Sequence, residues 1–186
     1  MKKILVKITI TILKIIAPLF YDKKFFKGRY FKTNEGWGWV LTGIWRQKIL
    51  GFNRHIPWPV NHSTMISNYK RIHFDINDIN NFQSAGCYFQ NFAADIKLGK
   101  GVYIAPNVGI ITANHDFSNL EKHLPGKDVI IGENCWIGMN SIILPGVELG
   151  NNIIVGSGSV VTKSFLEGSM IIAGNPAKII RKLDKH

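Results

Sequence analysis

Aliphatic residues recur at every sixth position along the C-terminal half of the chain. They are Ile131, Ile137, Ile143, Leu149, Val155 and Val161. Four residues after each of the first five comes a small or β-branched residue: Cys135, Ser141, Val147, Ile153 and Ser159. An amphipathic helix would show a period of 3.6 and a half-buried strand a period of 2. The six-residue period therefore predicts a repeat architecture rather than a helix or an ordinary sheet.

The residue after each aliphatic reveals a longer period. It is glycine at 132, 138, 150 and 156, but the third and sixth hexads have Leu144 and Thr162 instead. A period of eighteen fits a coil with three flat sides of six residues each, and we expect the glycines to supply the positive φ of its corners. Each coil can bury its apolar side only against the next coil. The pattern thus predicts a mainly β fold, a parallel β-helix of hexapeptide repeats.

The same phase is present earlier in the chain but is broken once. Leu98, Ile104 and Ile110 are also six apart, whereas Ile110 and Ile131 are separated by 21 residues, which is not a multiple of six. We therefore expect a β-helix domain over residues 61–183 with a loop extruded at about 116–128. Loops on such scaffolds often carry function. After Thr162 the pattern decays, and residues 171–183 predict a last strand and a short C-terminal helix with basic residues.

Residues 21–70 are rich in aromatic side chains and are punctuated by glycine and proline. Pro57 and Pro59 on either side of Trp58 predict an extended crossing, and residues 37–50 predict a short helix. The apolar end of a coiled prism must be covered, so residues 1–60 are interpreted as an N-terminal helical and aromatic cap. Clustered Trp and Tyr also line sugar sites, which is the alternative.

Residues 2–20 are apolar apart from threonines and from lysines that fall on one narrow stripe of a helix, including Lys3, Lys7 and Lys14. Lys7 and Lys14 interrupt what would be the core of a signal peptide, and the apolar runs are too short to span a bilayer. Nine of the eleven excess positive charges lie in residues 1–50. This placement disfavours nucleic acid and favours peripheral contact of residues 1–20 with an anionic membrane. Packing on the protein or on a neighbouring subunit is the alternative.

The chain has two cysteines, Cys87 and Cys135, which do not form a disulfide framework and fit a reducing cytoplasm. Neither has the surroundings of a nucleophile.

His115 is the candidate general base, because it stands where the coil ends and the extruded loop begins, and a neutral imidazole can accept a proton near pH 7. Asp116 is the candidate to orient its ring. His123 alone does not complete a zinc site with His115, so we expect no metal.

Several stretches resemble the hexapeptide-repeat acyltransferases with a left-handed parallel β-helix. These stretches are residues 104–107, 114–116, 131–138, 144–146, 155–163 and 173–177. The likeness covers a little under half of the chain and includes the galactoside, maltose and Nod-factor O-acetyltransferases as well as the capsule and exopolysaccharide O-acetyltransferases. The N-terminal half looks like the exopolysaccharide and capsule O-acetyltransferases.

The resemblance implies roles for particular residues. His115 matches the general base, and Trp136 an aromatic wall between the acceptor and the thioester. Further residues match positions along an acetyl-CoA channel: Met139, Ser157, Thr162, Lys163, Lys178 and Arg181. The acceptor residues do not align, so Tyr88, Asn91 and Asp116 are the candidates. The resemblance also implies a homotrimer whose active sites lie between subunits.

The resulting expectation is a cytoplasmic, acetyl-CoA-dependent O-acetyltransferase that acts on a sugar hydroxyl, in exopolysaccharide, capsule or lipid-linked glycan biosynthesis. Two alternatives stay open. One is an N-acyltransferase for an amino sugar or a small amine. The other is a non-catalytic, membrane-associated scaffold.

Overall fold

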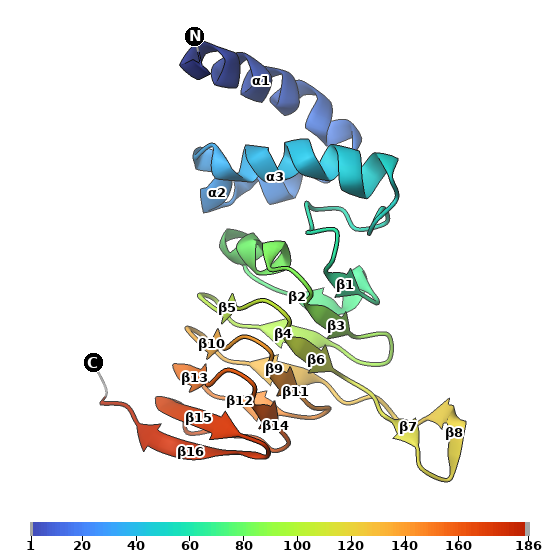
Figure 1. Ribbon diagram of the computed structural model, residues 1–186, viewed down its shortest axis with the longest axis vertical. Helices are drawn as coiled ribbons and strands as arrows, with labels where there is room; N and C mark the ends of the chain where they lie inside the picture. Colours follow the sequence, from blue (N-terminus) through green and yellow to red (C-terminus); the bar gives the residue numbers. More distant parts are fainter. Residues whose placement is uncertain (1, 185–186) are drawn as a thin grey trace.

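The hexads fold into short parallel strands that stack in three sheets around a common core, as the computed structural model of residues 2–184 shows (Figure 1). The first sheet contains β1 (Met65–Ile66), β3 (Tyr88–Gln90), β6 (Gly109–Ile111), β11 (Ile142–Ile143) and β14 (Val160–Val161). The second contains β5 (Tyr103–Ile104), β10 (Trp136–Ile137), β13 (Ile153–Val155), β15 (Met170–Gly174) and β16 (Ala177–Lys182). The third contains β2 (Ile72–His73), β4 (Ile96–Leu98), β9 (Val129–Ile131) and β12 (Glu148–Leu149).

Strand pairing confirms the eighteen-residue coil. Trp136 pairs with Ile154, and Ile142 pairs with Val160, each across one coil of eighteen residues. The aliphatics at every sixth position from Ile131 to Val161 point inward, and none is more than 1% exposed. The chain thus forms a prism with an apolar interior, and burying these side chains supplies the main stabilisation.

The predicted reason for the glycines after the aliphatics is wrong. Gly132, Gly138, Gly150 and Gly156 do not have positive φ; that conformation falls instead on Asn134, Asn140, Gly146, Asn152 and Gly158. Asparagine tolerates the left-handed region because its short amide side chain can form hydrogen bonds with the nearby backbone. Glycine is needed because neighbouring coils approach closely: a Cβ on Gly138 would lie 2.6 Å from the carbonyl oxygen of Val155.

The break in phase is a hairpin that leaves the prism at one corner (yellow in Figure 1). It consists of β7 (His115–Asp116) and β8 (Asn119–His123), paired antiparallel. It emerges after β6 of the first sheet, and the chain returns at β9 of the third. Consequently Ile142 lies opposite Gly109, 33 residues earlier, instead of the usual eighteen.

Helices and aromatic side chains cover the N-terminal end of the prism. The elements are α1 (Lys2–Ile16), η1 (Ala17–Leu19), η2 (Lys23–Lys27), α2 (Arg29–Lys32), α3 (Glu35–Gly43), η3 (Ile44–Ile49), η4 (Tyr69–Arg71) and η5 (Ile76–Gln83). The predicted helices at the N-terminus and within residues 37–50 are confirmed; α3 passes directly into η3, a π-helix. Phe25, Trp58, Phe74 and Phe82 pack together above the first coil, with ring centroids 4.6–6.0 Å apart in their contacts.

Over residues 2–184, no helix is both long enough and apolar enough to cross a bilayer.

The predicted C-terminal helix is wrong. Residues 177–182 form strand β16, which turns back at Gly174 (φ 109°) and pairs antiparallel with β15. Ile179 and Ile180 are β-branched and fit a strand. The open edge of β15 also offers backbone groups that a helix would leave unpaired. The hairpin therefore ends the second sheet.

Candidate active site

His115 stands at the root of the protruding hairpin with its ring held by the backbone. Its Nδ1 lies 2.7 Å from the carbonyl oxygen of Leu120 on the opposite side of the hairpin. A carbonyl oxygen can only accept a hydrogen bond, so the Nδ1–H must donate it. In the neutral ring Nε2 then carries the free lone pair. The side chain is exposed, and the geometry prepares Nε2 to take a proton.

A second histidine packs against this ring. His123 is the cross-strand partner of His115, with ring centroids 4.3 Å apart and planes inclined by 34°. Phe92 in turn contacts His123 edge-on, with ring centroids 5.0 Å apart and planes inclined by 76°. His123, held by Phe92, therefore helps to fix the orientation of the His115 ring. The sequence alone indicates His123 only as a possible metal ligand. The signal for its contact with His115 is the eight-residue spacing of the two residues across a hairpin.

Asp116 does not orient the ring of His115. Its carboxylate accepts hydrogen bonds from the hydroxyl of Ser118, at 2.6 Å, and from the backbone N–H of Ser118, at 2.8 Å. These two bonds hold the pKa of Asp116 below its usual value. The residue instead stabilises the hairpin turn, while the carbonyl of Leu120 takes the orienting role expected of it.

Of the two other acceptor candidates, the structure leaves only Tyr88 accessible. Tyr88 lies on the outward face of β3 and is 38% exposed. Asn91 is 0% exposed, and its amide exchanges two hydrogen bonds with the backbone of Asn68, at 2.7 and 2.9 Å. Asn91 therefore joins neighbouring coils, and its amide does not face a possible acceptor. The prediction that Asn91 binds the acceptor is not supported.

The residues matched to a coenzyme channel occupy one sheet and two corners of the prism. Trp136 is 54% exposed on the second sheet, in the same outward row as Ile154, Ile171 and Arg181. Lys178 lies on β16 of that sheet. Met139 and Ser157 follow β10 and β13, eighteen residues apart, at the corner that leads to the first sheet. The backbone N–H of Gly158, the residue after Ser157, donates a hydrogen bond of 2.8 Å to the carbonyl oxygen of Met139.

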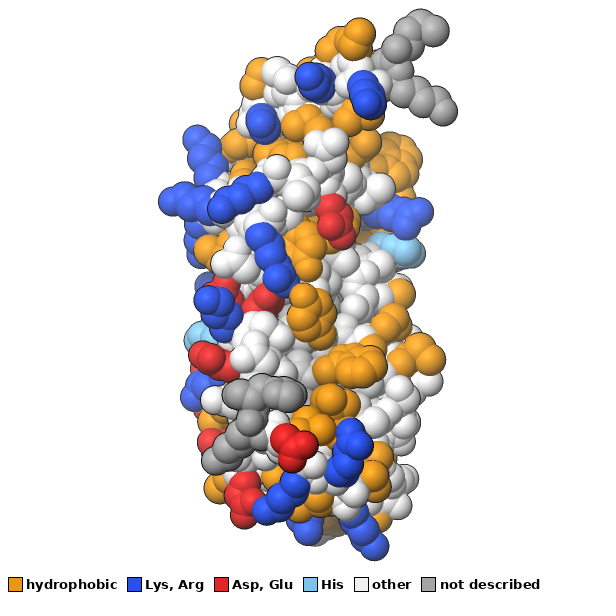
Figure 2. Space-filling view, turned by 90° about the vertical axis from the view of Figure 1, so that its left-hand side faces the viewer, with side chains coloured by type: hydrophobic (Ala, Val, Ile, Leu, Met, Phe, Trp, Pro, Cys, Tyr) orange, Lys and Arg blue, Asp and Glu red, His pale blue; other side chains and the backbone are white. Residues whose placement is uncertain are grey.

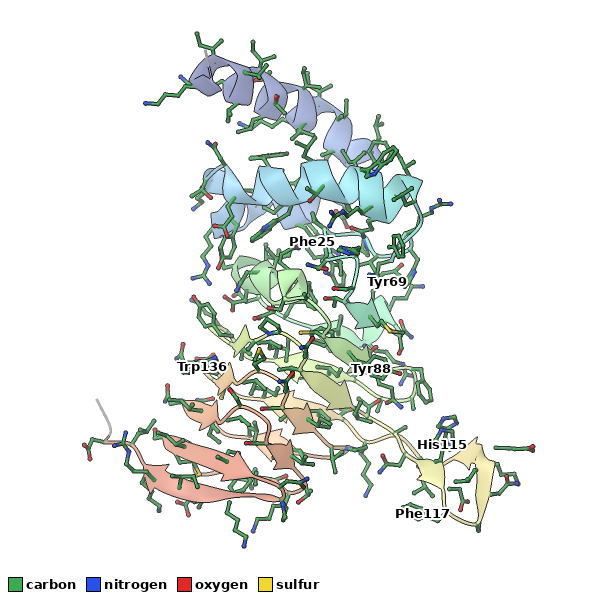
Figure 3. The ribbon with its side chains drawn as sticks, in the orientation of Figure 1. Phe25, Tyr69, Tyr88, His115, Phe117 and Trp136 are labelled. Atoms are coloured by element: carbon green, nitrogen blue, oxygen red, sulfur yellow. The ribbon has the colours of Figure 1, made fainter. Side chains whose placement is uncertain are left out.

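Thr162 and Lys163 occupy a different corner. They follow β14, where the first sheet gives way to the third, and the hairpin with His115 leaves the prism at the same corner in an earlier coil. Trp136, in contrast, lies on the opposite side of the column from His115 (Figure 3). A single chain therefore does not bring His115 and Trp136 into one cleft.

Two of the three outer faces are apolar. The outward row of the first sheet contains Met65, Tyr88, Gly109, Ile142 and Val160, and that of the second begins with Tyr103, Trp136 and Ile154. The third face is charged: Lys97 pairs with Asp128 at 2.7 Å, and His73 with Asp95 at 2.8 Å. Contiguous apolar surface on two faces is typical of a protein that binds copies of itself or a partner.

The described residues offer neither an accessible cysteine nucleophile nor a metal-binding cluster. Cys87 and Cys135 are buried, and desolvation raises the pKa of both thiols, so neither is an activated nucleophile. Among residues 2–184, no three His, Cys, Asp or Glu side chains cluster closely enough to hold a metal ion.

Comparison with known proteins matches the repeat region to a family model. Residues 128–163 match the family described as bacterial transferase hexapeptide (six repeats). The chain is 45% identical over 94 residues to the putative acetyltransferase YJL218W of Saccharomyces cerevisiae, covering 48% of this chain and 47% of that protein. It is 46% identical over 59 residues to galactoside O-acetyltransferase of Lactococcus lactis, covering 30% and 28%. The chain thus spans about half the length, or less, of these relatives.

A solved structure extends the likeness. The maltose O-acetyltransferase of Clostridium difficile 630 superimposes with a TM-score of 0.50 at 31% identity, covering 66% of this chain and 67% of that one. The match therefore includes sequence as well as fold.

Proposed function

Because the chain belongs to the hexapeptide-repeat acyltransferase family, we propose that it transfers an acetyl group from acetyl-CoA to a sugar hydroxyl. One observation carries the proposal: the hydrogen bond from Nδ1 of His115 to Leu120 leaves Nε2 as an exposed base. The galactoside and maltose enzymes among its relatives support a sugar acceptor. We further propose a left-handed coil, a cytoplasmic location where acetyl-CoA is available, and an acceptor from exopolysaccharide, capsule or lipid-linked glycan synthesis.

The proposed reaction needs one base and no covalent enzyme intermediate. Nε2 of His115 removes the hydroxyl proton as the sugar oxygen attacks the thioester carbonyl. The carbonyl oxygen of Leu120 stabilises the imidazolium that forms. The C–S bond breaks, the sugar keeps the acetyl group, and His115 returns its proton to the thiolate. Backbone N–H groups at the coil edges are the donors available for the oxyanion.

The proposed site is assembled from two copies of the chain in a homotrimer. The hairpin extends away from its own column, and the apolar first and second faces offer surface for neighbouring columns. His115 of one subunit then meets the channel residues of the next. Trp136 would wall the thioester, while Lys178 and Arg181 would face the nucleotide phosphates, Lys178 as a point charge and Arg181 as a bidentate fork.

The test is an assay of the purified full chain with acetyl-CoA and matched acceptors. We expect an acetyl ester on neutral, nucleotide-linked or lipid-linked sugars, released by mild base, and thiol production that depends on the acceptor. A base-stable amide formed on glucosamine but no ester on glucose would identify an N-acyltransferase. A trimer that binds no acetyl-CoA would identify a scaffold, and either result would overturn the proposal.

A further inference from the structure

Helix α1 has two apolar faces, and only one of them is covered by the protein. Leu13 and the following Ala17 are buried against the cap, at 3% and 0% exposure. A second row contains Ile4, Ile8, Ile12, Ile15 and Leu19, which are 51–80% exposed. The spacings of four and three place this row along one side of a helix. An uncovered apolar stripe of this length is typical of a contact surface.

Charge identifies the kind of partner. Lys3, Lys7 and Lys14 fall together along one edge of the same helix, between the uncovered row and the side that packs on the cap, where Lys14 Nζ lies 5.9 Å from the centre of the Trp37 ring. Helix α1 contains no acidic residue. The first acidic residue in the chain, Asp22, already pairs with Lys24 at 3.4 Å. In Figure 2 blue side chains gather over the N-terminal half, where few red ones lie. The partner is therefore apolar and negatively charged.

A second copy of the chain fits this surface poorly. Residues 1–50 contain eleven Lys and Arg but only Asp22 and Glu35 as acidic residues, so the N-terminal end of a neighbouring column presents the same excess of positive charge. A bilayer with anionic lipids fits both features: the isoleucines enter the acyl boundary and the lysines reach the headgroups along their aliphatic stems. We infer that α1, already docked on the cap through Leu13, rests flat on an anionic membrane.

The position of α1 in the fold determines how the β-column would be oriented relative to the membrane. Helix α1 lies across the end of the column, with the coils stacked behind it (Figure 1). When its uncovered row lies on the bilayer, the β-column stands away from the membrane and the His115 hairpin extends to the side.

The experiment measures co-sedimentation of the full chain with vesicles of phosphatidylcholine, with and without phosphatidylglycerol. We expect binding that requires phosphatidylglycerol and weakens as salt is raised. Replacing Lys3, Lys7 and Lys14 with Gln should weaken it roughly 100-fold, since each basic residue near the surface contributes about 1 kcal/mol. Ile8→Glu should weaken it at least about tenfold, because a charge enters the apolar row.

Leu166→Glu is the matched control, since this exposed leucine lies near the far end of the column. It should bind as the unmodified chain does, and thermal unfolding of both variants should match it. Equal vesicle binding by Ile8→Glu and Leu166→Glu would overturn the inference. So would a smaller oligomer for Ile8→Glu in light scattering, because the row would then be an interface between copies. Neither readout depends on acetyl transfer.

Discussion

Replacing His115 with alanine should lower kcat by roughly 10²–10⁴-fold, because the sugar hydroxyl then loses its proton acceptor. Binding of acetyl-CoA, measured by calorimetry, should stay nearly unchanged, since the hairpin places only the imidazole at the reacting atoms. His62→Ala is the matched control: this histidine contacts Arg46 at 3.2 Å near η3, far from the hairpin in sequence and fold. Its kcat should equal that of the unmodified protein. Substantial turnover by His115→Ala, with normal folding, would remove the assignment.

Replacing Gly138 with alanine should destabilise the fold by about 3 kcal/mol or more, at the upper end of overpacking effects. The new Cβ would lie 2.6 Å from the Val155 carbonyl oxygen and 2.7 Å from the Ser157 nitrogen, and both belong to backbone that cannot turn aside. The measurement is urea unfolding at a fixed protein concentration, because an oligomer's stability depends on concentration.

Gly38→Ala provides the contrast for this substitution. Gly38 lies on the exposed side of α3, and no atom lies within 4 Å of its would-be Cβ. We expect this change to stabilise the protein by about 0.5–1 kcal/mol, because alanine favours a helix more than glycine does. A Gly138→Ala variant as stable as the unmodified chain would show that neighbouring coils do not approach as closely as described.

The core of the fold was predictable because its signal is periodic. Every inward position from Ile131 to Val161 was identified correctly, since a side chain six residues on returns to the same prism interior. The role of Gly138 was not predictable in the same way. A glycine can be required either for a positive φ or because another backbone approaches closely. Only the stacked coils show that close approach is the reason here, and that asparagines adopt the positive φ at corners of the prism. The C-terminal strand was missed because basic residues with two isoleucines suit a helix or an edge strand equally.

The candidate site was predictable in its central residue and not in its surroundings. Both the position of His115 at the root of the loop and the resemblance indicate this residue. Its partners depend on the register of a hairpin that pairs it with His123 and brings the carbonyl of Leu120 to Nδ1. Asp116 was chosen because it is adjacent, yet successive residues of a strand point to opposite faces. Asn91 has no matching position in the resemblance, and its burial comes with hydrogen bonds to Asn68 in the neighbouring coil that the local sequence does not encode.

The central claim is that each active site combines His115 of one subunit with Trp136 of another, and mixing two inactive variants tests it most directly. His115→Ala removes the base, and Trp136→Arg places a bulky charge on the exposed row of the second sheet. Each variant alone should be inactive. When the two are unfolded together and refolded as a mixture, random assembly should leave about a quarter of the sites with both native residues, and activity should return to about that level. A mixture as inactive as its parents, in trimers shown to contain both variants, would contradict the account.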